Sequence, residues 1–231
     1  MLLLSGPIVC PGVVIELRRG GYPETAELVR AITGAADVVV FDHNIRRGGD
    51  RAKVQPACGV KRPVFHIHTD FSGKSAQIRA AAVVGKAQTT DQRIAAINVW
   101  RPIAGPLRDC PLAICDASSV EERDLLATDL LYSDRTGEIY YVAFNPAHRW
   151  FYASDMRINE VWMFKNYDSA TDGRARQRLW LKSREAHSRD ISSPSACISP
   201  KNWIIGGSFT SHFSDIASQA LPWQMAGSVL I

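Results

Sequence analysis

The sequence predicts a mainly β protein with peripheral helices. Three segments rich in aromatic and β-branched residues follow one another between residues 138 and 168, and polar turns separate them. Two earlier segments have the composition of short helices. A dense series of short strands is typical of an antiparallel β-sandwich or barrel, with the helices placed at its periphery.

The first half of the chain is expected to alternate helices and strands. In GYPETAELVRAITG, Pro23 suits the first helical position and Gly34 the end of the helix. The β-branched run ADVVVFDH predicts a buried strand, and residues 44–62, rich in Gly, Arg and Lys, predict a loop. A strand is expected at Val64, followed by a helix in SAQIRAAAVVGKA and a strand in AAINVWRPI that Pro102 ends.

The second half is expected to hold one helix and most of the strands. SSVEERDLL offers a serine cap before acidic residues, which predicts a helix that starts near Ser118 or Ser119. EIYYVAFNP, HRWFYASDM and EVWMFKNYD predict strands. Residues 177–231 differ in composition, because they hold 11 serines in 55 positions whereas residues 1–176 hold 8. We expect this serine-rich tail to pack less regularly than the rest.

Composition indicates one globular domain over residues 1–231. Hydrophobic residues make up 46% and charged residues 22% of the chain, as in ordinary globular proteins. The net charge of +4 comes from scattered basic residues, so nucleic acid is not an expected partner. The apolar start has no basic segment and is interrupted by Pro7 and Pro11, which argues against a membrane partner.

The cysteines and the missing motifs narrow the function further. Five cysteines without a C-x-x-C pair indicate neither a disulfide framework nor a zinc knuckle, and they favour a cytoplasmic location. The chain contains no G-x-S-x-G, P-loop, G-x-G-x-x-G or H-E-x-x-H motif. The common hydrolase, nucleotide-binding and zinc-protease signatures are therefore missing.

The segment VFHIHTDFSG carries a candidate metal site. On a strand, residues two apart share a face and lie roughly 6.6 Å apart, so His66, His68 and Asp70 are predicted to project together. H-x-D is typical of the two-histidine, one-carboxylate triad that holds non-haem Fe(II). A solvated polar strand end is one alternative. A mononuclear metallo-hydrolase using His66, His68 and Asp70 is another, although Phe71 stands where such strings carry a second-metal histidine.

Three further residues are candidates for the same site. His148 in NPAHRW is the candidate third metal ligand, and His187 in REAHSRD is an alternative. A turn histidine ahead of a buried Trp150 explains His148 equally well. Arg101 in NVWRPI is a candidate for binding the carboxylate of a co-substrate, and an ion pair with a nearby acid is its alternative role.

Five longer phrases of the sequence, taken together with their order and spacing, resemble the AsaB-like hydroxylase/desaturase family. This family includes proteins labelled CmcJ-like, cephem methoxylase related or gibberellin desaturase related. The resemblance covers about residues 22–176. The phrases are YPETAELVRAITGAADVVVFDHNIRR, HIHTDFSGKSAQIR, INVWRPIAGPLRDCPLAICDASSV, DLLYSDRTGEIYYVAFNPAHRWFYASDM and EVWMFKNYDSATDGRAR.

The resemblance implies an oxidoreductase of fungal secondary metabolism. Its fold would be a double-stranded β-helix, or jelly-roll, and its chemistry would be the hydroxylation or desaturation of a small molecule with Fe(II), 2-oxoglutarate and O₂. In the family's H-x-D phrase the two ligands correspond to His68 and Asp70. His66 stands where the family has a residue that is not a ligand.

The chain departs from the family pattern at both ends. Family members continue after DGRAR with a phrase like PHTAF, which is expected to supply the distal histidine, and later with an arginine-containing strand. Here Trp180 stands about where that histidine would be. The resemblance therefore implies a jelly-roll that is shortened or altered at its ends and has impaired activity. A catalytically inactive relative with a binding role is the alternative.

Overall fold

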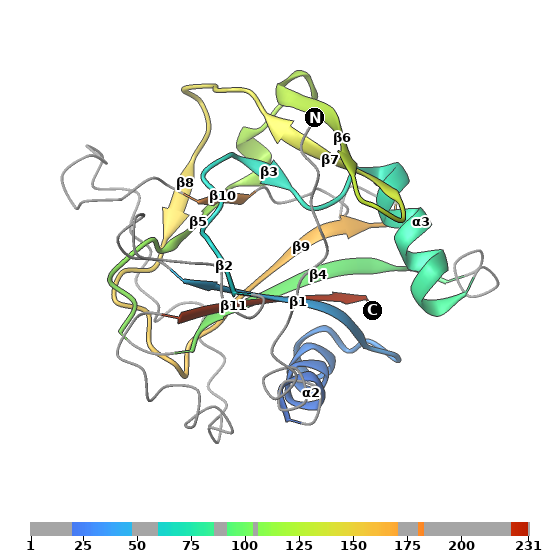
Figure 1. The fold of residues 1–231 in the computed structure, drawn as a ribbon, viewed down its shortest axis with the longest axis horizontal. Coiled ribbons are helices and arrows are strands. Elements are labelled where there is room, and N and C mark those ends of the chain that lie inside the picture. Colours follow the sequence, from blue (N-terminus) through green and yellow to red (C-terminus); the bar gives the residue numbers. More distant parts are fainter. Residues whose placement is uncertain are drawn as a thin grey trace.

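The computed structural model describes residues 20–47, 60–85, 92–103, 106–170, 180–182 and 223–230. These residues form two β-sheets and two α-helices (Figure 1). The helices are α2 (Tyr22–Thr33) and α3 (Gly73–Val84). The strands are β1 (Val39–Arg47), β2 (Val60–Lys61), β3 (His68–Thr69), β4 (Ala95–Pro102), β5 (Leu112–Cys115), β6 (Leu125–Leu131), β7 (Thr136–Val142), β8 (Trp150–Tyr152), β9 (Trp162–Asp168), β10 (Trp180–Lys182) and β11 (Trp223–Leu230).

The two sheets face each other. The five-stranded sheet has the order β2-β1-β11-β4-β9, and the six-stranded sheet has the order β6-β7-β3-β10-β5-β8. Neighbouring strands are antiparallel, except that β1 and β2 are parallel. Figure 1 shows one sheet above the other, with α2 below the five-stranded sheet. This arrangement confirms the predicted class, a mainly β jelly-roll with peripheral helices.

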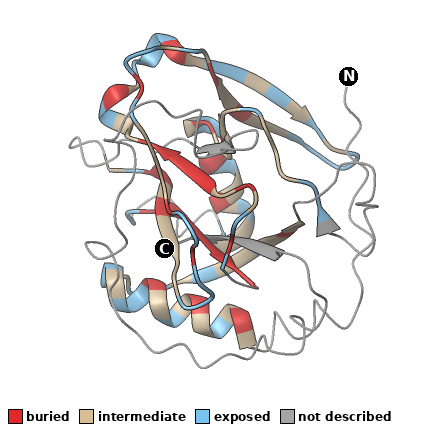
Figure 2. Ribbon diagram, turned by 90° about the vertical axis from the view of Figure 1, so that its left-hand side faces the viewer, coloured by how far each residue is buried: buried red, intermediate tan, exposed pale blue. Residues whose placement is uncertain are grey.

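The main hydrophobic core lies between the sheets. Trp100 on β4 and Phe164 on β9 meet Leu112 and Ile114 on β5 of the opposite sheet. Trp100 and Leu112 are at most 1% exposed, and burying side chains of this size stabilises a fold by roughly 1.5–3 kcal/mol each. In Figure 2 the buried residues gather on the inner strands, whereas the β6–β7 hairpin at the top is mostly half-buried or exposed.

Helix α2 forms as the sequence predicts and covers the outer face of the five-stranded sheet. Pro23 stands in its first turn, and Gly34 ends it with φ of 70°, a left-handed conformation that glycine adopts without strain. Val29 is fully buried against Ile97 and Val99 of β4. The face of β4 that carries Ile97 and Val99 is therefore the outer face, and the alternate residues point between the sheets.

The second helix also forms, but the helix expected after Ser118 does not. Ser72 caps α3 by accepting a hydrogen bond from the Ser75 amide, and the helix ends before Gly85. After Ser118 the chain makes two 3₁₀ turns, Ala117–Ser119 and Glu122–Asp124, and then enters β6. Strand β6 pairs with β7 along its whole length, and this pairing overrides the local helical preference. Strand β5 was not predicted at all.

Two segments of the serine-rich tail belong to the sheets. Strand β11 lies between β1 and β4, and β10 lies between β3 and β5. The expectation of a less regular tail is therefore wrong for residues 180–182 and 223–230. None of the helices in the described part of the chain is long and apolar enough to cross a membrane.

Candidate metal centre

His68 and Asp70 come together at the end of β3. The strand comprises only His68 and Thr69, so Asp70 is the first residue after it. Nε2 of His68 lies 3.5 Å from Oδ1 of Asp70, and the two side chains are 17% and 34% exposed. Thr69 between them is fully buried, and its hydroxyl donates to the carbonyl of Phe71. The side chain of Thr69 thus holds the turn that carries Asp70.

Hydrogen bonds orient both side chains. Nδ1 of His68 lies 2.8 Å from the carbonyl oxygen of His66. Because a carbonyl only accepts, Nδ1 donates its proton to it, and Nε2 is the nitrogen that faces Asp70. Asn98 of β4, itself 2% exposed, donates from Nδ2 to Oδ2 of Asp70 at 2.5 Å. Such supporting bonds are how proteins aim histidine and carboxylate ligands at a metal.

The two side chains shift each other's pKa in opposite directions. Burial alone would raise the pKa of Asp70, but the hydrogen bond and charge of His68, with smaller contributions from Asn98 and Arg46, lower it. Burial would lower the pKa of His68, but the hydrogen bond and charge of Asp70 raise it. The metal-free pair therefore favours an imidazolium next to a carboxylate.

The pair fits two positions of a divalent ion. Ligand atoms about 2.1 Å from one ion lie about 3.0 Å apart at right angles and about 3.4 Å apart in a tetrahedron, close to the 3.5 Å between His68 and Asp70. Oδ1 of Asn98 is buried without a partner in the described ranges, which leaves an acceptor for a ligand or water. However, no three His, Cys, Asp or Glu residues of the described chain are grouped to hold a metal. The described residues thus supply two ligands.

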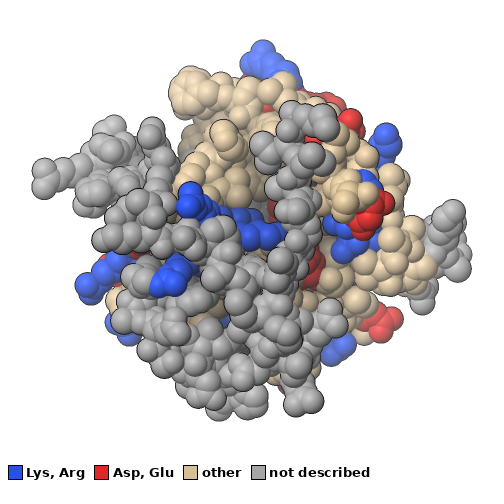
Figure 3. All heavy atoms as spheres, in the orientation of Figure 1, with Lys and Arg blue, Asp and Glu red and all other residues tan. Residues whose placement is uncertain are grey.

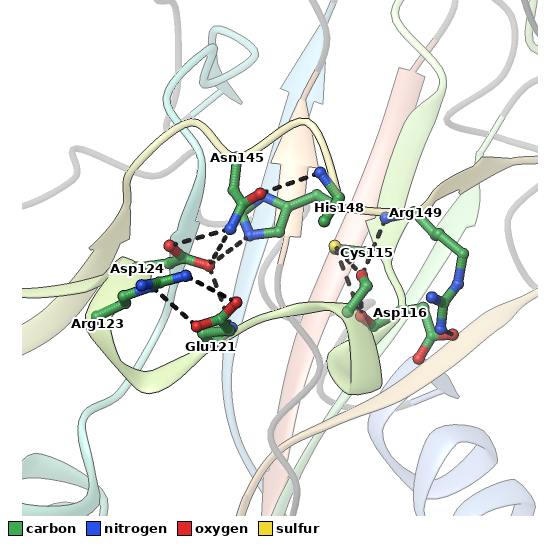
Figure 4. Close-up of polar contacts among 10 residues, drawn as sticks. Cys115, Asp116, Glu121, Arg123, Asp124, Asn145, His148 and Arg149 are labelled. Atoms are coloured by element: carbon green, nitrogen blue, oxygen red, sulfur yellow. Dashed lines mark hydrogen bonds and ion pairs between the residues drawn. The ribbon is translucent and has the colours of Figure 1, made fainter.

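His148 lies in a different polar cluster (Figure 4). Its Nε2 is 2.9 Å from Oδ2 of Asp124, and Asn145 donates to the same carboxylate at 3.1 Å. The side chains of His148 and Asp124 are only 2% and 8% exposed. The hydrogen bond from His148 is the largest of the effects that lower the pKa of Asp124. The structure therefore gives His148 a structural role and does not bring it to His68 and Asp70.

Arg101 lies on the opposite face of β4 from Asn98. Its guanidinium binds both carboxylate oxygens of Glu24 on α2, at 3.0 and 3.3 Å. Arg101 and Glu24 line a shallow hollow on the outer face of the sheet, which Val161 also lines. The alternative role as an ion-pair partner is the one that the structure supports. The guanidinium is thus engaged with Glu24 on the α2 side of the sheet.

His66 does not join the pair, so the described residues do not support the metallo-hydrolase alternative. Residues 62–67 are not part of a strand, and the predicted alternation of three side chains on one face fails there. His66 is exposed, its ring lies against Tyr141, and no three-ligand group exists among the residues that the structure describes. His187, the other candidate ligand, lies outside them.

The strand register places two aromatic residues opposite His68. Tyr141 of β7 is its partner on one side, and Trp180 of β10 is its partner on the other. Directly opposite residues of an antiparallel pair have Cβ atoms about 4.5–5.5 Å apart on the same face. Position 180 is therefore where a third ligand would be close to His68.

Sequence reasoning missed Asn98 and Arg46. Asn98 is the polar residue in the middle of AAINVW, and its place in a fully buried strand was an available signal. Arg46 sits on β1, and its charge contributes to the lowered pKa of Asp70 only because the fold brings β1 near the end of β3. No local pattern in the sequence predicts that effect.

The family profile described as Oxidoreductase/YMDC permease-like domain matches residues 15–183. The chain belongs to this family. The hydroxylase/desaturase efuI of Hormonema carpetanum is 32% identical over 183 residues, which are 68% of this chain and 60% of that relative. The hydroxylase/desaturase asaB of Aspergillus flavus is 35% identical over 99 residues, 37% of this chain and 43% of the relative. The resemblance to AsaB-like fungal oxygenases is confirmed.

A solved structure has the same fold as this family member. The iron and alpha-ketoglutarate-dependent endoperoxidase NvfI superposes with a TM-score of 0.67 over 97% of this chain and 76% of its own, at 21% identity. The curated sequence nvfI, from Aspergillus novofumigatus, is 28% identical over 64% of this chain and 53% of its own. The chain thus spans between 53% and 60% of the length of relatives such as nvfI and efuI.

Proposed function

We propose that this chain is an Fe(II)/2-oxoglutarate-dependent hydroxylase or desaturase that acts on a small molecule of secondary metabolism. The observation that carries the proposal is the His68–Asp70 pair, with Nε2 of one and Oδ1 of the other 3.5 Å apart and both side chains held by outside hydrogen bonds. Relatives named Fe(II)/2-oxoglutarate-dependent dioxygenase and alpha-ketoglutarate-dependent dioxygenase support it.

His68 and Asp70 would hold the iron. Bound Fe(II), together with 2-oxoglutarate, supplies the activation of O₂ that removal of a hydrogen from a substrate carbon requires. The hydrogen bond from Nδ1 of His68 to the carbonyl of His66 leaves Nε2, once it has lost its proton, as the nitrogen aimed at the site. Asn98 neutralises part of the charge on Oδ2 of Asp70 and leaves Oδ1 available as a ligand.

Residues 1–231 would act as one domain, located in the cytoplasm. Cys115 is a buried free cysteine, as is usual in a reducing compartment. The proposal leaves His148 and Arg101 outside the site.

A second candidate function is ligand binding without catalysis. It is favoured by the absence of a three-ligand group among the described residues and by the tryptophan opposite His68. A metal held by two protein ligands binds weakly, and a family member in that state would keep a small-molecule site without turnover.

Consumption of 2-oxoglutarate distinguishes the two functions. Purified protein is incubated with Fe(II), 2-oxoglutarate and O₂, and the formation of succinate and CO₂ is measured in the wild type, His68→Ala and His66→Ala. The oxygenase proposal expects succinate from the wild type and His66→Ala and none above background from His68→Ala. Equal background rates in all three proteins would support the non-catalytic relative.

A further inference from the structure

Strand β6 forms a free edge of the six-stranded sheet. Among the described strands its one neighbour is β7, and Figure 2 shows much of the β6–β7 hairpin exposed at the top of the molecule. The pairing with β7 runs through all of Leu125–Leu131 without a bulge. Natural edge strands are commonly protected by a proline, a lysine or a bulge, and β6 contains none of the three. Its edge is therefore regular and open to another strand.

The hydrogen-bond pattern shows which residues face this edge. At the hairpin turn the amide of Tyr132 donates to the carbonyl of Arg135, and at the other end the amide of Ala143 donates to the carbonyl of Asp124. Hydrogen-bonded and non-hydrogen-bonded pairs alternate along an antiparallel ladder, so the even-numbered residues of β6 bond to β7. The N–H and C=O groups of the odd-numbered residues therefore point to the free edge.

The apolar pattern of β6 is palindromic. Its sequence LLATDLL has two leucines at each end and three smaller residues centred on Thr128. Leu126 and Leu131 are 52% and 44% exposed. Together with Phe144, just after β7, they are three of the six exposed large hydrophobic side chains in the described part of the chain. The exposed apolar surface is thus concentrated at this hairpin, as is typical of an interaction surface.

Two copies of β6 fit each other around a two-fold axis at Thr128. In this antiparallel register Leu125 lies opposite Leu131 of the second copy, and Leu126 lies opposite Leu130 of the second copy. Every leucine of the strand therefore faces a leucine. The odd-numbered residues form the hydrogen-bonded pairs of this register, as their outward N–H and C=O groups require.

Charge also favours this register. Asp129 is the only charged residue of β6, and it lies opposite Ala127 of the second copy. A register centred on residue 129 would place two carboxylates directly opposite each other, which destabilises a sheet. The largest gathering of Lys and Arg side chains in Figure 3 lies across the middle of the face, left of and below the place where Figure 1 draws β6. These basic side chains therefore lie away from the edge.

We propose that β6 pairs with β6 of a second copy of this chain, in the antiparallel register centred on Thr128, and so joins two six-stranded sheets into one continuous sheet. The partner is a second copy because the edge is complementary to itself: the leucines, the outward hydrogen-bonding groups and the single charge match around one axis. Strand β7 separates β6 from β3, which carries His68. The dimer is therefore independent of metal binding and of the proposed function.

Sedimentation velocity of the full chain, over about 1 to 100 μM, measures the association. Ala127→Pro removes an N–H that points to the free edge and leaves the bonds to β7 intact. It is expected to raise the dimer dissociation constant by at least about tenfold. Ile78→Lys, which changes a 61% exposed side chain on α3, is the control and should leave the constant unchanged. Asp129→Asn removes two like charges that lie diagonally across the axis, and it should tighten the dimer by about two- to fivefold.

Cysteine cross-linking tests the register. The Cα atoms of a non-hydrogen-bonded antiparallel pair lie about 4.5 Å apart, which permits a disulfide. Thr128→Cys lies opposite its own copy in such a pair, so mild oxidation is expected to give a disulfide-linked dimer. Leu126→Cys is the matched control, because its own copy lies about 13 Å further along the strand. The double variant Leu126→Cys/Leu130→Cys should cross-link. Wild-type protein treated in the same way gives the background from the native cysteines.

Two results would overturn the inference. The first is wild-type protein that sediments as a monomer at every concentration. The second is a dimer whose affinity is unchanged in folded Ala127→Pro and which cross-links equally through Thr128→Cys and Leu126→Cys. Melting curves check that each variant is folded. If Ala127→Pro does not fold, tightening by Asp129→Asn together with a cross-link in Thr128→Cys and none in Leu126→Cys supports the pairing, and the absence of both contradicts it.

Discussion

Trp180 lies directly opposite His68 in the antiparallel pair of β10 and β3. Directly opposite positions of an antiparallel pair have Cβ atoms about 4.5–5.5 Å apart. The chain therefore has two ligands at the pair and a tryptophan at the position from which a third would come.

Trp180→His is expected to tighten Fe(II) or Mn(II) binding by at least about tenfold, because it adds an imidazole to the His68–Asp70 pair. Leu181→His is the matched control, since residue 181 is adjacent on β10 and pairs with Ala113 of β5 instead of His68. Equilibrium dialysis under anaerobic conditions measures both affinities. A gain of the same size in both variants, or in neither, would contradict the role of position 180.

Asn98→Ala is expected to weaken metal binding by about 10- to 100-fold, because Oδ2 of Asp70 loses its donor and the carboxylate is no longer oriented. Asn145→Ala is the control, since it removes the same kind of amide from Asp124 in the other cluster. Mn(II) titration followed by electron paramagnetic resonance reports the free ion directly. Equal affinities of the two variants would show that Asn98 does not position Asp70.

Metal affinity is expected to rise between about pH 6 and pH 8. The pKa of His68 is raised by its contact with Asp70, so a proton occupies the imidazole up to a higher pH than usual and competes with the metal. Above the raised pKa the competition ends and the affinity levels off. A metal affinity that stays constant over this range would contradict His68 as a ligand.

His148→Gln is expected to lower the melting temperature by about 3–8 °C and to leave metal affinity unchanged. The variant removes the imidazole that bonds to the buried carboxylate of Asp124. The pKa of Asp124 is lowered in the folded protein, so its contribution to stability is present above the unfolded pKa and is lost as the pH falls through the folded value. The variant should therefore lose less stability on acidification than the wild type. A fall in metal affinity would instead indicate that His148 is a metal ligand.

Local sequence patterns predicted the two candidate metal ligands. The residues that position them depend on the arrangement of the strands. His68 and Asp70 are two residues apart, so their proximity follows from a short strand end and needs no long-range contact. Asn98 reaches Asp70 only because β4 and β3 belong to facing sheets. Such contacts depend on the register of distant strands, which a single sequence does not contain.

Arg101 and Arg46 show the same limit of prediction from a single sequence. Arg101 was the candidate anchor, but α2 packs on its side of β4 and gives it Glu24 as a partner. Arg46 points between the sheets because a bulge between Val40 and Asp42 shifts the alternation of β1. A one-residue shift moves every later side chain to the other face of the sheet. The sequence ADVVVFDH contains no pattern that predicts this bulge.

The central claim is that His68 and Asp70 bind a metal ion. Anaerobic Fe(II) titration of the wild type, His68→Ala, Asp70→Asn and His66→Ala tests it most directly, with the 2-oxoglutarate charge-transfer absorption as an independent readout. We predict that binding and absorption are lost in His68→Ala and Asp70→Asn and kept in His66→Ala. Fe(II) affinity in His68→Ala and Asp70→Asn equal to that of the wild type would contradict the claim.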